Sequence, residues 1–75
     1  MNVTYKNLRL FVEQEEKGWI ASVSDLNRFE FVYEGQVYHR TAEEARKEAE
    51  AIAGGVLKED IELDWSRASA MKAHG

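Results

Sequence analysis

The chain has 75 residues, which is enough for one domain near the lower size limit for independent folding. Hydrophobic residues make up 44% and charged residues 32%, which excludes a typical disordered segment, and the absence of Cys excludes disulfides. A net charge of -4 argues against a general nucleic-acid binder, and neither a signal segment nor a membrane-spanning run is present. We therefore expect a cytoplasmic domain without a membrane partner, which forms a homodimer or higher homo-oligomer to supplement its small core.

The first half of the chain shows the alternation of hydrophobic and polar residues that is typical of half-buried strands. It occurs over residues 8–13 and again over 19–24, separated by a charged turn that ends in Gly18. The expected inward side chains are Leu8, Leu10 and Val12 from the first run and Trp19, Ala21 and Val23 from the second. These two runs are predicted to form a hairpin.

A second strand region follows a loop at residues 25–28. Alternation resumes over 29–33, Gly35 interrupts it, and a β pattern continues over 37–40. The dipeptide Glu34-Gly35 resembles the pairs that make tight hairpin turns, so a second hairpin is predicted. The alternative is one continuous strand with a glycine bulge.

The clearest element is a helix that begins after Thr41. Thr41 and Glu44 have the spacing of a capping box, in which each residue satisfies an amide of the other. Small or apolar residues then recur at helical spacing, namely Ala45, Ala49, Ile52 and Ala53. This narrow stripe should let the helix lie close to a sheet, and Gly54 is predicted to supply the left-handed stop.

Residues 61–65 alternate again and predict a last strand that buries Trp65. We expect one domain over residues 1–66 and a disordered tail over 67–75. The predicted class is α+β: an antiparallel sheet of three to five strands with one helix packed on one face, in the order β-β-β(-β)-α-β. The uncovered face would hold residues such as Ile20, Val32 or Tyr38 among charges, depending on the register.

The residues that carry chemistry do not converge. His39 lies in a predicted strand and is interpreted as partly buried, and His74 belongs to the tail. Asp25 and Asp64 fall near strand ends, where a two-metal nuclease places its acids, but no further acid is positioned to join them. We therefore predict no catalytic residue, no cofactor and no metal site, and no enzymatic activity.

Several aromatic residues could either stack on bases or fill the core. They are Trp19, Trp65, Phe29, Phe31 and Tyr33. In a small acidic domain the core interpretation is the simpler one.

Short motifs in the chain point to a family. They are Gly18-Trp19-Ile20-Ala21, Asp25-Leu26, Thr41-Ala42-Glu43-Glu44-Ala45 and Glu50-Ala51-Ile52. With these motifs the chain resembles, over about residues 8–65, the N-terminal domain of HicB-like antitoxins. It departs from the family pattern at Ser24, where the family usually has Pro, and at residues 27–29, where Pro-Gly-Cys is usual. The stretch 29–40 is also longer than the family norm.

The resemblance implies a partial ribonuclease-H-like fold that binds and blocks a small basic toxin that cleaves messenger RNA. Longer relatives add a DNA-binding module, whereas this chain ends soon after Trp65. We therefore expect a stand-alone form with no DNA binding by this chain alone. By analogy the partner surface includes the loop after the second family strand, with Asp25, Leu26, Asn27 and Arg28 as contact residues; simple solvation of that loop is the competing interpretation.

Two other functions remain open at this point. One is a stand-alone oligomeric structural domain of the same fold with no toxin partner. The other is a weak nucleic-acid or ligand binder that uses the aromatic face of the sheet.

Overall fold

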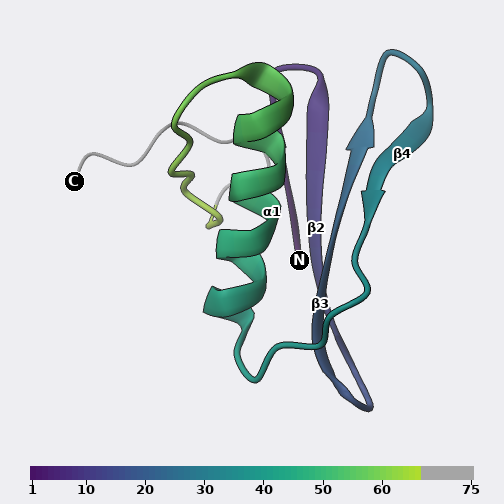
Figure 1. The fold of residues 1–75 in the computed structure, drawn as a ribbon, viewed down its shortest axis with the longest axis vertical. Helices are drawn as coiled ribbons and strands as arrows, with labels where there is room; N and C mark the ends of the chain where they lie inside the picture. Colours follow the sequence, from purple (N-terminus) through teal and green to yellow (C-terminus); the bar gives the residue numbers. More distant parts are fainter. Residues whose placement is uncertain (67–75) are drawn as a thin grey trace.

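The structure, a computed structural model, describes residues 1–66 and contains a four-stranded antiparallel sheet with one helix packed against it (Figure 1). The elements in chain order are β1 (Asn2–Tyr5), β2 (Leu8–Glu15), β3 (Gly18–Asp25), β4 (Glu30–Glu34) and α1 (Ala42–Leu57). The strands are neighbours in the same order, because each is joined to the next by a short connection. The predicted α+β class, with the helix on one face of the sheet, is confirmed.

The central hairpin also forms as predicted. β2 and β3 pair with Leu10 opposite Val23 and Val12 opposite Ala21, and all four side chains are fully buried beneath α1. Because side chains alternate across a strand, the residues between them lie on the opposite face of the sheet. The core therefore lies between this one face and the helix.

β1 is a strand that the sequence pattern did not predict. Only four residues long, it pairs antiparallel with β2, and Val3 opposite Leu10 is fully buried. The Met1 amino group donates to the Val12 carbonyl oxygen at 2.7 Å, which extends this pairing. The alternation of β1, Val3 and Tyr5 against Asn2 and Thr4, spans only four residues and is therefore a weak signal.

The helix packs through its small-residue stripe. Ala45, Ala49 and Ala53 are fully buried, and Ile52 packs partly against the core. At the N-terminus, the Thr41 hydroxyl oxygen accepts from the Glu44 amide at 3.2 Å, as the capping box predicts. The Glu44 carboxylate returns to Thr41 by accepting from the Thr41 hydroxyl at 3.1 Å.

Gly54 does not end the helix, so that prediction is wrong. α1 continues to Leu57, and Lys58 takes the left-handed conformation with a φ of 57°, while the Glu59 amide donates to the Gly54 carbonyl oxygen at 3.0 Å. A Cβ at Gly54 would lie 2.7 Å from the Glu59 carbonyl oxygen. Glycine is therefore needed here because the chain folds back tightly over the last turn.

The predicted strand over residues 61–65 is also wrong, because the described residues contain no strand after α1. Instead one carboxylate of the helix holds this segment: Glu50 accepts from the Leu63 amide at 2.8 Å and from the Trp65 indole at 3.0 Å. Leu63 is buried and Trp65 packs against the core, as expected for its side chain. The predicted tail over 67–75 lies outside the described residues.

The second hairpin at Gly35 does not form. The chain continues beside β3 beyond β4, with Glu34 opposite Ser22 and a bridge between Trp19 and His39, whose amides and carbonyls exchange two hydrogen bonds of 2.8 Å. A Cβ at Gly35 would lie 2.1 Å from the Ala21 carbonyl oxygen, so this glycine permits a close crossing and not a reversal. The alternative, one strand with a glycine bulge, is nearer to the structure.

Candidate protein interface

The loop predicted to contact a partner is a tight connection between β3 and β4. The Asp25 carboxylate accepts from the Asn27 amide at 2.9 Å and from the Asn7 side chain at 3.4 Å. Its carbonyl oxygen accepts from the Phe29 amide at 2.9 Å. Asp25 therefore holds the turn in shape, as Asp commonly does through bonds to the backbone two residues on.

The other three predicted contact residues differ in exposure. Leu26 is half-buried, and its amide donates to the Asn7 carbonyl oxygen at 2.8 Å. Asn27 and Arg28 are exposed at the tip, and Arg28 lies 3.8 Å from the Asp25 carboxylate and 4.0 Å from that of Glu30. Exposed ion pairs of this kind contribute little to stability, so they would not prevent Arg28 from contacting a partner.

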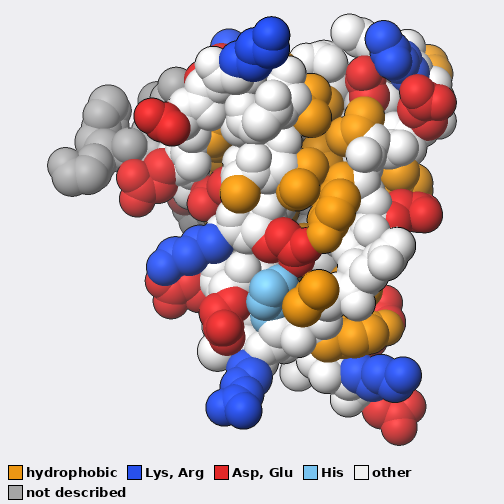
Figure 2. Space-filling model, in the orientation of Figure 1, with side chains coloured by type: hydrophobic (Ala, Val, Ile, Leu, Met, Phe, Trp, Pro, Cys, Tyr) orange, Lys and Arg blue, Asp and Glu red, His pale blue; other side chains and the backbone are white. Residues whose placement is uncertain are grey.

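The most unusual surface is the segment from residue 29 to residue 38, here called the apolar edge segment. Seven large hydrophobic side chains are exposed among the described residues, and five belong to this segment. They are Phe29, Phe31, Val32, Val37 and Tyr38. Figure 2 shows hydrophobic side chains gathered on the side of the molecule between α1 and β4, with acidic side chains around them.

The sequence did not predict this exposure because a bulge changes the alternation of β4. Phe31 is opposite Ser24 and Tyr33 is opposite Val23, so Val32 is an extra residue between the two pairs. Phe31 consequently lies on the open face of the sheet, while Tyr33 lies on the helix face and packs against the core. The interpretation of these aromatic residues as core holds for Tyr33 and is wrong for Phe29 and Phe31.

β4 also has a free edge, since β3 is the only described strand that pairs with it. Unpaired backbone groups on an edge strand can accept a further strand unless the edge is protected. Glu30 and Glu34 stand at the two ends of β4, and the bulge at Val32 lies between them. These features protect the edge in part.

On the helix face, three polar side chains of different elements meet. The Glu48 carboxylate accepts from the Tyr33 hydroxyl, and its other oxygen lies 2.7 Å from Nε2 of His39. The hydrogen bond to Glu48, together with burial, raises the pKa of Tyr33 above its usual 10.0. His39 is half-buried, as predicted, and the cluster ties the chain between β4 and α1 to the helix.

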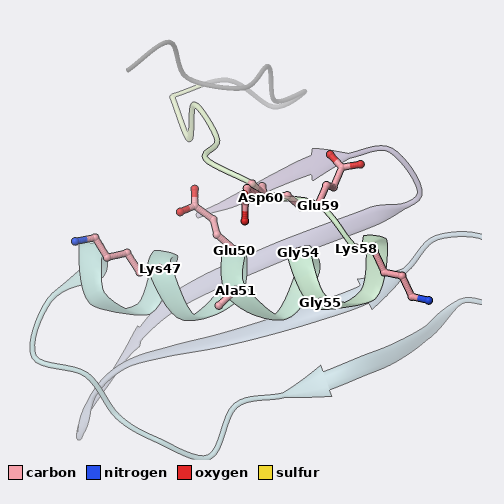
Figure 3. Close-up of a pocket in the computed structure, with 9 residues that line it drawn as sticks. Lys47, Glu50, Ala51, Gly54, Gly55, Lys58, Glu59 and Asp60 are labelled. Atoms are coloured by element: carbon pink, nitrogen blue, oxygen red, sulfur yellow. The ribbon is translucent and has the colours of Figure 1, made fainter.

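A shallow groove of about 670 Å³ runs along α1 under the returning chain (Figure 3). Two of its carboxylates have structural partners: Glu50 holds Leu63 and Trp65, and Glu59 accepts from the Tyr5 hydroxyl at 2.6 Å. Lys47 and Lys58 stand at its two ends (Figure 3). We interpret this groove as the junction between the helix and the segment that follows it.

Among residues 1–66, no three His, Cys, Asp or Glu side chains are grouped so that they could hold a metal ion. No helix of the described part is long and apolar enough to cross a membrane. The chain matches no protein-family model, no curated protein and no solved structure.

Proposed function

We propose that this chain is a non-enzymatic interaction module which, like the HicB-type antitoxins it resembles, binds and neutralises a small basic toxin that cleaves messenger RNA. The observation that carries the proposal is the apolar edge segment, residues 29–38, which borders a free sheet edge. Monomeric proteins seldom expose contiguous apolar surface without a function for it, and binding of another protein is the commonest one.

The charges near this segment favour a basic partner. Glu13, Glu16 and Glu34 are exposed, and their side-chain carboxylates make no hydrogen bond or ion pair with any other residue of 1–66. The cation nearest in sequence, Arg28, already lies beside Asp25 and Glu30. Complementary charge accelerates association and selects among partners. The exposed loop tip at Asn27 and Arg28 adjoins the same segment, and we include it in the proposed contact surface.

The ionisable groups near the segment support binding rather than catalysis. His39 and Tyr33 both use their polar atoms on Glu48, and Asp25 uses its carboxylate to hold the turn. These three groups are thus engaged in holding the fold.

The first test is whether a gene next to this chain's own gene encodes a small basic protein, and the second is co-expression of the two proteins. We expect relief of growth arrest and co-purification. The variant Val37→Asp, within the segment, should abolish both, whereas Val56→Asp should not. Val56 is the matched control because its exposure of 48% is close to the 56% of Val37, while it lies on the helix. Persistent growth arrest without co-purification of the wild-type chain would exclude the antitoxin function.

A second candidate is self-association of a structural domain through the same segment. It is favoured by the same exposed hydrophobic residues and by the small core of a chain this short. Sedimentation at high concentration distinguishes the two functions: a dimer that Val37→Asp dissociates supports self-association, and a monomer contradicts it.

A further inference from the structure

The face of the sheet opposite α1 contains a hollow of about 250 Å³. Six side chains line it: Phe11, Glu13, Glu15, Ile20, Ser22 and Phe31. All belong to β2, β3 or β4, and the register explains their convergence, because Phe11 pairs with Ser22 and Glu13 with Ile20. The hollow is therefore built on regular strands and not on loops.

Two aromatic rings form the apolar part of the hollow. The ring centroids of Phe11 and Phe31 are 6.0 Å apart, and the ring planes are tilted by 52°. Phe31 keeps 52% of its surface exposed, so a ligand can reach this residue from solvent. The faces of aromatic rings attract cations, and the planar guanidinium group of arginine stacks on them.

Two carboxylates form the polar part. Glu15 accepts from the Tyr38 hydroxyl at 3.1 Å, which fixes one of its oxygens and raises the pKa of Tyr38. Glu13 has no partner among residues 1–66. No cation lines the hollow, and Arg9, the basic residue on the same face of β2, directs its Nε to the Thr4 hydroxyl at 3.4 Å.

We propose that this hollow is the receptor site for one arginine side chain of the basic partner. The proposal rests on the proposed function and names the contact that selects the partner. A guanidinium group can donate to the Glu13 and Glu15 carboxylates while its plane lies on an aromatic ring, and a lysine ammonium cannot stack in this way. The volume suits one side chain, since drug-sized ligands need about 300–1,000 Å³.

The experiment is a titration of the ¹⁵N-labelled chain with a capped Gly-Arg-Gly peptide, followed by amide chemical shifts. We expect saturable shifts at Phe11, Glu13, Ile20 and Phe31, with small changes on α1. The capped Gly-citrulline-Gly peptide, which has nearly the same shape without the charge, should cause no saturable shift. A lysine peptide should bind more weakly than the arginine peptide.

Matched variants separate the site from the overall charge. Glu13→Gln should weaken binding of the arginine peptide about threefold to tenfold, since hydrogen bonds between charged groups are the stronger ones. Glu43→Gln changes the net charge equally on the exposed helix surface and should leave the affinity unchanged. The spectra themselves report whether each variant is folded, and Phe31→Leu provides a second test through loss of the ring.

Three results would overturn the inference: no saturable shift in the hollow, equal binding of the citrulline or lysine peptide, or equal weakening by Glu43→Gln. Its failure is distinct from failure of the proposed function. If the partner co-purifies but the arginine peptide does not bind the hollow, only the receptor site is wrong. If the peptide binds the hollow and no partner relieves growth arrest or co-purifies, the receptor site stands and the antitoxin function fails.

Discussion

The two faces of the central hairpin differ although the same two strands, β2 and β3, build both. Leu10, Val12 and Ala21 face α1 and are fully buried, whereas their neighbours Phe11, Glu13 and Ile20 face the uncovered side. One helix can cover only one face of the sheet. Adjacent positions of one strand can therefore have separate tasks: those on the helix face stabilise the fold, and those on the open face form the proposed recognition site.

The largest expected effect is a test of this division at two adjacent residues. Leu10→Ala should lower the free energy of unfolding by about 2–5 kcal/mol, because it leaves a cavity in the core. Phe11→Ala should lower the free energy of unfolding by clearly less than Leu10→Ala, since the Phe11 ring is partly solvated. The same variant should weaken binding of the arginine peptide. Urea unfolding monitored by circular dichroism measures both stabilities. Equal losses would contradict the assignment of separate tasks.

The next effect concerns the segment after α1, which is held on the helix side of the molecule. Glu50→Ala should lower the free energy of unfolding by about 1–3 kcal/mol, because the Leu63 amide and the Trp65 indole lose their acceptor. Trp fluorescence should shift to longer wavelength as Trp65 becomes solvated. Glu43→Ala, on the exposed surface of the same helix, is the control and should change neither quantity appreciably.

Two adjacent glycines of the helix should respond in opposite directions. Gly54→Ala should destabilise the fold by about 1 kcal/mol, because the new Cβ meets the Glu59 carbonyl oxygen and this strain exceeds the gain in helix propensity. Gly55→Ala meets no atom within 4 Å and should stabilise by about 0.5–1 kcal/mol. Thermal unfolding of the two variants measures both effects. Stabilisation by both substitutions would show that the packing of Glu59 over the last helical turn does not require Gly54.

The smallest expected effect concerns the pH dependence of stability, compared between Tyr33 on the helix face and Tyr38 on the open face. The pKa of Tyr33 is raised in the folded state by its bond to Glu48, so the neutral hydroxyl contributes stability below pH 10 that is lost as pH rises through the folded pKa. Tyr33→Phe should therefore have a lower free energy of unfolding than wild type at pH 7. The difference between variant and wild type should narrow above pH 10.

Tyr38 is the matched residue at the open face, since its pKa is raised by Glu15 in the same direction. At pH 7, Tyr38→Phe should lower the free energy of unfolding by less than Tyr33→Phe does. Tyr38 is exposed, so water can replace its hydrogen bond to Glu15. Urea unfolding at pH 7 and at several values above pH 10 provides the measurement. A gap for Tyr33→Phe that stays constant across this range would contradict the role of the hydroxyl proton.

The sequence by itself determined the elements whose signals are local. The alternation around Leu10 and Ala21 predicted the central hairpin, and Thr41 with the alanine stripe predicted the capped helix and its buried side. These predictions succeed because strand periodicity, capping and helix amphipathicity depend on residues only a few positions apart.

The tertiary structure decided the features that depend on contacts between distant residues. The bulge at Val32 placed Phe31 on the open face, the close approach of Gly35 to Ala21 replaced a hairpin, and Glu50 bound the Leu63 amide and the Trp65 indole of the segment after α1. None of these follows from a local pattern, because each depends on which backbone or carboxylate lies opposite in space. The proposed recognition surface arises from the same long-range pairing, which brings Phe11 and Glu13 of β2 together with Phe31 of β4.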